Sequence, residues 1–301
     1  MQTERDFTGS EVKLHHAEGP RSGPPLLLIH GVTRRWQDFV TLLPALTLRH
    51  HVLAIDQRGH GKSSRAGGRY HVVDYIRDAV DFLRSAISEP TIVYGHSLGA
   101  MVAAGAAAEA PDRVRALVLE DPPFDTMGYR IRETPFQAFF EGLRETLAVG
   151  ERTVAALASR MAEIRMPKML EGGGLSTETV RLGSTRDATA LRFGARCLLD
   201  VDPGVLTPII DGRWLDGYDR DAILRRIECP TLLLQADYTV GGMLSDRDAA
   251  SAVSLLRQGS HVKLDRVGHQ IHWLAPEATA RLVCGFLESI GDSPLFDRPV
   301  S

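Results

Sequence analysis

Short apolar runs alternate with longer amphipathic patterns along most of the chain. The runs are continuous and rich in Leu, Ile and Val: Leu26–Ile29, Val52–Ile55, Ile92–Tyr94, Ala116–Leu119, Leu232–Leu234 and Val262–Leu264. Continuous apolar runs are typical of strands covered on both faces, so they predict a parallel sheet with helical crossovers. Amphipathic spacing or small residues predict the helices, over Phe39–Leu48, Val72–Ile87, Leu98–Ala110 and Glu277–Ile290.

The alternation of strands and helices stops in the middle of the chain. Between Phe124 and Tyr218 no strong strand run occurs, and helical patterns such as Phe136–Leu147 and Thr153–Ile164 accompany the glycine run 172–174. We therefore expect an α/β core of residues 1–123 and 219–301 with a helical insertion of residues 124–218. The C-terminal residues after Ile290 predict a loose tail.

Composition excludes several classes of protein. The 301 residues are 44% hydrophobic and 24% charged, which is ordinary for a globular protein. The formal net charge of −3, without blocks of like charge, argues against nucleic acid or a membrane as a partner and favours a small-molecule substrate. The sequence has neither a signal peptide pattern nor an apolar segment of membrane length, so a cytoplasmic protein is expected. We expect a monomer or a homodimer. Three widely separated cysteines form neither a disulfide framework nor a metal knuckle, so we expect no metal and no cofactor.

The strongest chemical signal is the segment Gly95-His96-Ser97-Leu98-Gly99. It follows the apolar run that ends at Tyr94 and precedes the predicted small-residue helix. A strand that turns sharply into a helix needs glycines beside the turning residue, and such a turn pushes a serine hydroxyl outward. The segment therefore predicts a nucleophile elbow with Ser97 as the nucleophile.

This elbow and three further segments resemble the α/β-hydrolase superfamily, over nearly the whole chain outside the insertion. His30-Gly31-Val32 resembles the loop in which the residue after His-Gly donates a backbone N–H to the oxyanion, so the resemblance implies an oxyanion hole formed by Val32 and Leu98. The segment from Asp56 to Ser63, DQRGHGKS, resembles a structural turn of the family. Its Gly-Lys-Ser is not a phosphate loop, because Asp56 stands where that pattern requires glycine.

The resemblance places the catalytic histidine at His269, in the turn Val-Gly-His after the last predicted strand. His272 is the alternative. The order nucleophile, acid, histidine then requires an acid between Ser97 and His269.

The acid departs from the commonest pattern of the family, because Thr239 occupies the position where that pattern has aspartate. A minority of the superfamily supplies the acid from the strand after the elbow helix, and Asp121 ends that strand here. We favour Asp121, which would hold the histidine in its reactive tautomer. The alternatives are Asp237 and, behind it, Glu120 and Asp246. The combination is similar to the E-2-(acetamidomethylene)succinate hydrolase-like enzymes, a serine-hydrolase branch with a helical cap.

The insertion predicts a cap over Ser97, and its inward side chains shape a substrate pocket. Candidate substrate-binding residues are Arg34 and Arg35, which follow the oxyanion loop and could bind a carboxylate, and the apolar residues Phe124, Phe136 and Trp214.

These features predict a serine hydrolase that cleaves a small carboxylic ester or lactone through an acyl-enzyme. Hydrolysis of an amide or of a C–C bond in a diketone uses the same residues and stays open. Epoxide hydrolases and haloalkane dehalogenases of the family have Asp as elbow nucleophile, which disfavours them, and the long insertion disfavours a perhydrolase. A small-molecule receptor on a hydrolase scaffold is the alternative outside enzymes.

Overall fold

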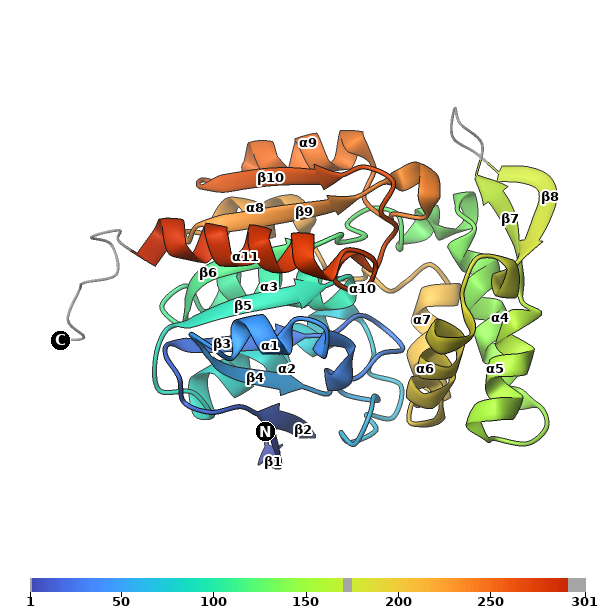
Figure 1. Ribbon diagram of the computed structural model, residues 1–301, viewed down its shortest axis with the longest axis horizontal. Helices are drawn as coiled ribbons and strands as arrows, with labels where there is room; N and C mark the ends of the chain where they lie inside the picture. The colour runs from blue at the N-terminus through green and yellow to red at the C-terminus, as the bar shows by residue number, and fades with distance from the viewer. Residues whose placement is uncertain (1, 170–174, 292–301) are drawn as a thin grey trace.

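A computed structural model of the chain describes residues 2–169 and 175–291. Its centre is an eight-stranded sheet in the order β1-β2-β4-β3-β5-β6-β9-β10 (Figure 1). The strands are β1 (Thr3–Thr8), β2 (Lys13–Glu18), β3 (Pro25–Ile29), β4 (His51–Ile55), β5 (Thr91–His96), β6 (Val114–Glu120), β9 (Thr231–Ala236) and β10 (Gly259–Leu264). The neighbours from β4 to β10 pair in parallel, whereas β2 is antiparallel to both β1 and β4. The predicted mostly parallel α/β sheet is confirmed.

Helices cover both faces of this sheet (Figure 1). On one face lie α1 (Leu43–Leu46) and α11 (Pro276–Gly291), and on the other lie α2 (Val72–Ser85), α3 (Leu98–Glu109), α8 (Arg220–Arg226) and α9 (Asp246–Leu255). Strand β3 shows why the run is continuously apolar. Leu27 and Ile29 belong to the apolar core beneath α2 and α3, whereas Leu26 and Leu28 belong to the core beneath α1 and α11.

Two segments of the core differ from the sequence prediction. The predicted helix over Phe39–Leu48 is shorter: a 3-10 turn η1 (Trp36–Phe39) precedes α1, and Pro44 lies in the first turn of α1, where its ring prevents continuation towards the N-terminus. The N-terminal hairpin β1-β2 was not predicted. Its outer strand β1 is polar and mostly exposed, so it has no apolar run to reveal it.

The insertion lies beyond the carboxyl ends of the parallel strands (Figure 1). Its helices are η2 (Tyr129–Glu133), α4 (Phe136–Ala148), α5 (Val154–Ala162), η3 (Leu182–Ser184), α6 (Ala188–Leu199), η4 (Pro203–Val205) and α7 (Leu206–Ile210). It is not purely helical as predicted, because β7 (Arg165–Met169) and β8 (Leu175–Arg181) form an antiparallel pair. The side chains of β8 are polar and largely exposed, which hid this strand in the sequence.

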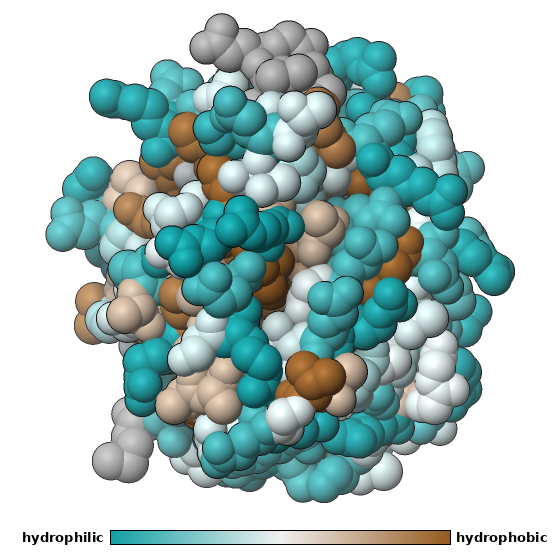
Figure 2. Space-filling model, turned by 90° about the vertical axis from the view of Figure 1, so that its right-hand side faces the viewer, coloured by the Kyte–Doolittle hydropathy of each residue, from teal (hydrophilic) through white to brown (hydrophobic). Residues whose placement is uncertain are grey.

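The glycine run 172–174 and residues 292–301 of the predicted tail lie outside the described residues. The face of the insertion is mainly hydrophilic, with apolar side chains gathered between the polar ones (Figure 2). Among the described residues, no helix has both the length and the apolar character needed to cross a membrane.

Candidate active site

Ser97 lies at the sharp turn between β5 and α3. Its backbone has φ 54° and ψ −118°, a conformation that a residue with a side chain rarely adopts. The flanking glycines make this turn possible: a Cβ atom on Gly95 would lie 2.0 Å from the Gly99 carbonyl oxygen, and one on Gly99 would lie 1.9 Å from the Ile29 carbonyl oxygen. The geometry is that of a strained strand-to-helix elbow, as predicted from the glycine spacing.

Two backbone N–H groups near this elbow remain available. Neither the Val32 N–H nor the Leu98 N–H donates a hydrogen bond to any residue that the structure describes. Leu98 is the first residue of α3, so its N–H belongs to the positive end of the helix dipole. Next to Val32, the Thr33 N–H donates to His60 Nε2 at 3.0 Å, which holds the loop in place.

The structure brings His269 and Asp121 together. The distance from His269 Nδ1 to Asp121 Oδ2 is 2.6 Å, and the Asp121 side chain is 0% exposed. Three backbone N–H groups also donate to this carboxylate: Met243 to Oδ2 at 2.8 Å, and Ala236 and Leu244 to Oδ1 at 3.1 and 3.3 Å. These bonds hold the buried carboxylate in place and fix the His269 ring with Nδ1 as donor and Nε2 free to accept a proton.

The alternative acids make other contacts. Asp237 Oδ1 accepts from the Thr239 N–H and hydroxyl, and its Oδ2 accepts from the Arg266 N–H. Asp246 accepts from Lys263 and Gln235. Neither of these carboxylates contacts His269.

Glu120 and the alternative histidine, His272, form a second pair beneath the first. The distance from His272 Nδ1 to Glu120 Oε1 is 2.8 Å, and both side chains are fully buried. Burial alone would lower the pKa of His272, but the charges of Glu120 and Asp38 outweigh it and raise that pKa to about 10. Burial likewise opposes ionisation of Glu120, but His272 and His96 lower its pKa to about 2. His272 therefore does not face the substrate and is held by Glu120.

His96 links this buried pair to the loop that contains His269. Its Nε2–H donates to the His269 carbonyl oxygen at 3.0 Å, and its ring lies 4.6 Å from the ring of His269. Burial lowers the pKa of His96 to about 3, so its ring is neutral. His96 thus supports the position of His269 from below.

Ser97 and His269 line one cavity of about 610 Å³, together with His96 and Val32. Most other lining residues come from the insertion: Met127, Pro135, Phe136, Phe139, Phe140, Met166, Pro167, Lys168, Val180, Leu182, Thr185 and Arg186. This volume suits a small organic molecule. The insertion thus shapes the space in front of the serine.

Three arginines line this cavity: Arg34, Arg186 and Arg266. Arg34 stacks over the Phe193 ring at 5.8 Å, and its Nε lies 3.9 Å from Asp38 Oδ1. Among the described residues, the Arg186 side chain has neither an ion pair nor a hydrogen bond, and burial together with the charge of Arg34 lowers its pKa. A half-buried guanidinium without an acidic partner is unusual, because burial of an unpaired charge is costly. Such a group is well suited to bind an anionic ligand.

The predicted substrate-binding residues divide into two groups. Arg34 and Phe136 line the cavity. Arg35, Phe124 and Trp214 do not: Arg35 points to Asp200, with 3.6 Å between Nη1 and Oδ2, and the two aromatic residues are buried in the core. Arg186 was missed by sequence reasoning, because it lies in a loop of the insertion where no motif marks it.

Comparison with known proteins supports the same fold. Residues 24–158 match the family model described as alpha/beta hydrolase fold. The chain superimposes on the crystal structure of E-2-(acetamidomethylene)succinate hydrolase with a TM-score of 0.72 and 23% identity, covering 96% of this chain and 100% of that one. The chain therefore has the α/β-hydrolase fold, as its sequence motifs predicted.

Two curated hydrolases are similar to this chain in sequence. The chain is 40% identical over 100 residues to 2-(acetamidomethylene)succinate hydrolase of Mesorhizobium japonicum, a match that covers 33% of this chain and 36% of that protein. It is 26% identical to epoxide hydrolase B of Mycobacterium tuberculosis, over 89% of this chain and 92% of that protein. The first similarity agrees with the resemblance derived from the motifs.

Proposed function

We propose that this protein is a serine hydrolase that cleaves a small acyl compound bearing a carboxylate. The observation that carries the proposal is the common cavity: Ser97 and His269 line it, and a 2.6 Å hydrogen bond joins His269 to the buried Asp121. A serine, an oriented imidazole and a buried carboxylate in this order are the parts of acyl-transfer catalysis.

The reaction follows from these parts. Ser97 Oγ attacks the carbonyl carbon of the substrate while His269 Nε2 accepts the hydroxyl proton. The N–H groups of Val32 and Leu98 stabilise the resulting oxyanion. His269 then gives the proton to the leaving group, which departs and leaves an acyl-serine. Water attacks this ester with His269 again as the base, and the acid is released as Ser97 regains its proton.

The charge of the cavity supports a substrate with a carboxylate. Arg186 lies in the cavity without an acidic partner among the described residues, and Arg34 lies near it. A planar guanidinium binds a carboxylate through two parallel hydrogen bonds. The names of the succinate hydrolase among the relatives and of the superimposed structure agree with this charge.

An ester or lactone is the first candidate for the scissile bond, and an amide is the second. The amide is favoured by one observation, the acetamido group in the substrate name of the same relative. The similarity to an epoxide hydrolase does not favour epoxide opening here, because the elbow residue is Ser97. Localisation in the cytoplasm and a monomeric or homodimeric state remain predictions.

Matched substrates test the proposal. We would measure kcat and KM for 4-nitrophenyl acetate, the 4-nitrophenyl monoester of succinic acid and the corresponding 4-nitroanilide. We expect turnover of the succinyl compounds that disappears in Ser97→Ala. Arg186→Gln should raise KM for the succinyl ester by about 10- to 100-fold, the value of one lost charged hydrogen-bond pair. The acetyl ester should change by less than about twofold, within the range of a surface substitution.

Arg35→Gln is the matched control, because Arg35 faces Asp200 and does not line the cavity. Equal effects of Arg35→Gln and Arg186→Gln would contradict the assignment of the carboxylate site. Labelling of Ser97 without sustained turnover of any compound would instead support a receptor on a hydrolase scaffold.

A further inference from the structure

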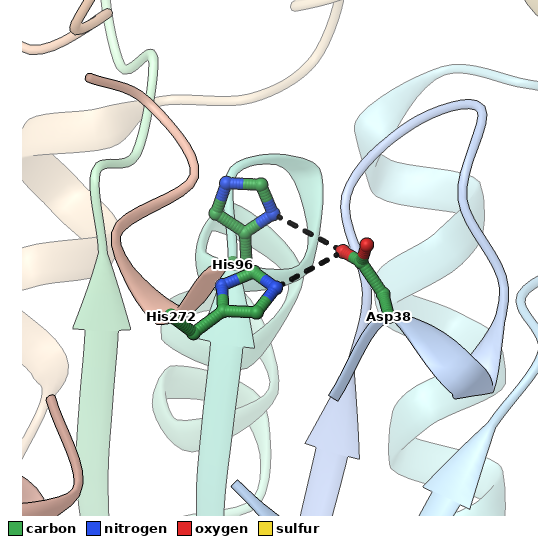
Figure 3. Close-up of side chains that lie close together, drawn as sticks. All are labelled: Asp38, His96 and His272. Atoms are coloured by element: carbon green, nitrogen blue, oxygen red, sulfur yellow. Dashed lines mark ion pairs between the residues drawn. The ribbon is translucent and has the colours of Figure 1, made fainter. Parts of the chain in front are cut away.

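Three buried polar atoms converge beneath the loop that contains His269. They are Asp38 Oδ2 from η1, His96 Nδ1 from the end of β5 and His272 Nε2 from α10 (Ile271–Leu274), as Figure 3 shows. All three lie within 4.8 Å of one another. None of the three forms a hydrogen bond within the described part of the chain, and each residue is at least nine-tenths buried; their contacts are the ion pairs of Asp38 Oδ2 with His272 Nε2 and with His96 Nδ1. Buried polar atoms normally have a partner, so this convergence indicates a missing ligand.

The second polar atom of each residue is already engaged. His96 Nε2–H donates to the His269 carbonyl oxygen, and His272 Nδ1–H donates to the Glu120 carboxylate. The Trp273 indole N–H donates to Asp38 Oδ1 at 3.1 Å, and the Arg34 guanidinium approaches the same oxygen. When His272 has lost its Nε2 proton, these contacts leave a free lone pair on each of the three atoms. A histidine that donates its second N–H to a carboxylate or a carbonyl is the usual arrangement for a metal ligand.

Two of the three separations are close to those between the ligands of a small divalent cation. Asp38 Oδ2 lies 3.4 Å from His272 Nε2 and 3.7 Å from His96 Nδ1. Two tetrahedral ligands of zinc, each about 2.0–2.2 Å from the ion, lie about 3.3–3.6 Å apart. Water fits less well, because it has two hydrogens for three acceptors. A cation satisfies all three at once and compensates the buried charges of Asp38 and Glu120.

From this geometry we infer that Asp38, His96 and His272 form a binding site for a divalent transition-metal ion of the Zn²⁺ class. Asp38, His96 and His272 are fully buried or nearly so, and His96 also lines the catalytic cavity, which provides the route of entry. Ser97 Oγ and His269 are not among the three ligands, so the ion is structural and takes no part in acyl transfer. It joins η1, the nucleophile elbow and the segment after His269, three parts that the catalytic geometry must hold together. This departs from the expectation of a metal-free protein drawn from the sequence.

A proton is the competitor for this place. Without a metal ion, Glu120 and Asp38 stabilise a second proton on His272, and the ion replaces that proton when it binds. An experiment must therefore distinguish two states of this site: one with a bound metal ion and one with a doubly protonated His272.

Metal content decides between them. Purified protein, prepared without an affinity tag or a chelator, is incubated with Zn²⁺, freed of excess ion and analysed by inductively coupled plasma mass spectrometry. We expect one Zn²⁺ per chain, and loss of that ion in Asp38→Asn and His272→Gln. His15→Gln is the matched control, because His15 pairs with the surface carboxylates Glu4 and Asp6 and lies outside the cluster.

Cobalt substitution keeps the test independent of the variants. If His272→Gln does not fold, the wild-type protein is titrated with Co²⁺, and we expect the intense visible absorption of a tetrahedral site, saturating at one ion per chain. Wild-type protein that binds no ion, or that loses it equally in His15→Gln, overturns the inference. Because neither readout depends on catalysis, its failure is distinct from failure of the proposed hydrolase function.

Discussion

Replacement of Asp121 by asparagine tests the proposed catalytic arrangement at the hydrogen bond between Asp121 and His269. Asp121 Oδ2 faces two donors, His269 Nδ1–H at 2.6 Å and the Met243 N–H at 2.8 Å. In Asp121→Asn the amide NH₂ can face His269 and Met243, or it can face the N–H groups of Ala236 and Leu244. The first orientation costs less, because His269 can change tautomer and accept from the amide, whereas the second leaves two N–H donors without an acceptor. In the first case His269 turns to the tautomer with the proton on Nε2, and Nε2 no longer accepts the Ser97 proton.

The expected magnitude follows from these contacts. Loss of the correct tautomer lowers kcat by about three to four orders of magnitude. With the amide facing His269, the Met243 N–H loses its acceptor, and one lost hydrogen bond to a charged group reduces the free energy of unfolding by about 1.5–3 kcal/mol. The assay is kcat with the succinyl nitrophenyl ester, after circular dichroism has shown that the variant is folded at the assay temperature.

Asp237→Asn is the matched control for this prediction. Asp237 binds Thr239 and the Arg266 N–H and does not contact His269, so kcat should stay within about twofold, the range of a surface change. A folded Asp121→Asn that retains more than about a tenth of kcat, or a larger loss in Asp237→Asn, would refute the assignment of Asp121 as the acid.

Other expected outcomes concern stability and the cavity. Burial lowers the pKa of His60 to about 4, against about 6.5 in the unfolded chain, so the unfolded chain binds more protons below pH 6.5. This contribution to the free energy of unfolding is complete above pH 6.5 and decreases by about 3 kcal/mol as the pH falls to 4. Urea unfolding of His60→Asn should therefore show a weaker dependence of stability on pH. An unchanged pH dependence in that variant would contradict this reasoning. Gly99→Ala should lower the melting temperature and abolish turnover, because its Cβ would lie 1.9 Å from the Ile29 carbonyl oxygen. Full activity of that variant would show that the elbow tolerates a side chain. Phe136→Ala enlarges the cavity and should raise KM for short acyl esters; an unchanged KM would show that this side chain does not contact the substrate.

The parallel strands of the central sheet could be predicted from the sequence, because strands buried on both faces consist of continuous apolar residues. The run Leu26–Ile29 is apolar at every position because alternate residues enter two different cores. Strands β1 and β8 have no such mark, since their side chains are mostly polar and exposed. Pattern reasoning therefore found the covered strands and missed those at the edge and in the insertion.

In the site, too, the residues set by local sequence could be predicted, whereas those brought together by tertiary packing could not. Ser97 is recognisable from the glycines beside it, and Asp121 from its place at the end of a strand, because both are set by local backbone geometry. Arg186 and the cluster of Asp38, His96 and His272 are brought together only by tertiary packing. No spacing in the sequence predicts such contacts. The sequence motifs placed His96 in the elbow segment and made His272 an alternative catalytic histidine.

The most direct test of the central claim is detection of the acyl-enzyme at Ser97. The protein is mixed with the 4-nitrophenyl monoester of succinic acid, quenched with acid within the first turnovers and analysed by intact and peptide mass spectrometry. The account predicts a succinyl group on the peptide containing Ser97, released with time in the wild-type protein and absent in Ser97→Ala. Sustained hydrolysis by Ser97→Ala, or a covalent adduct on another residue, would contradict it.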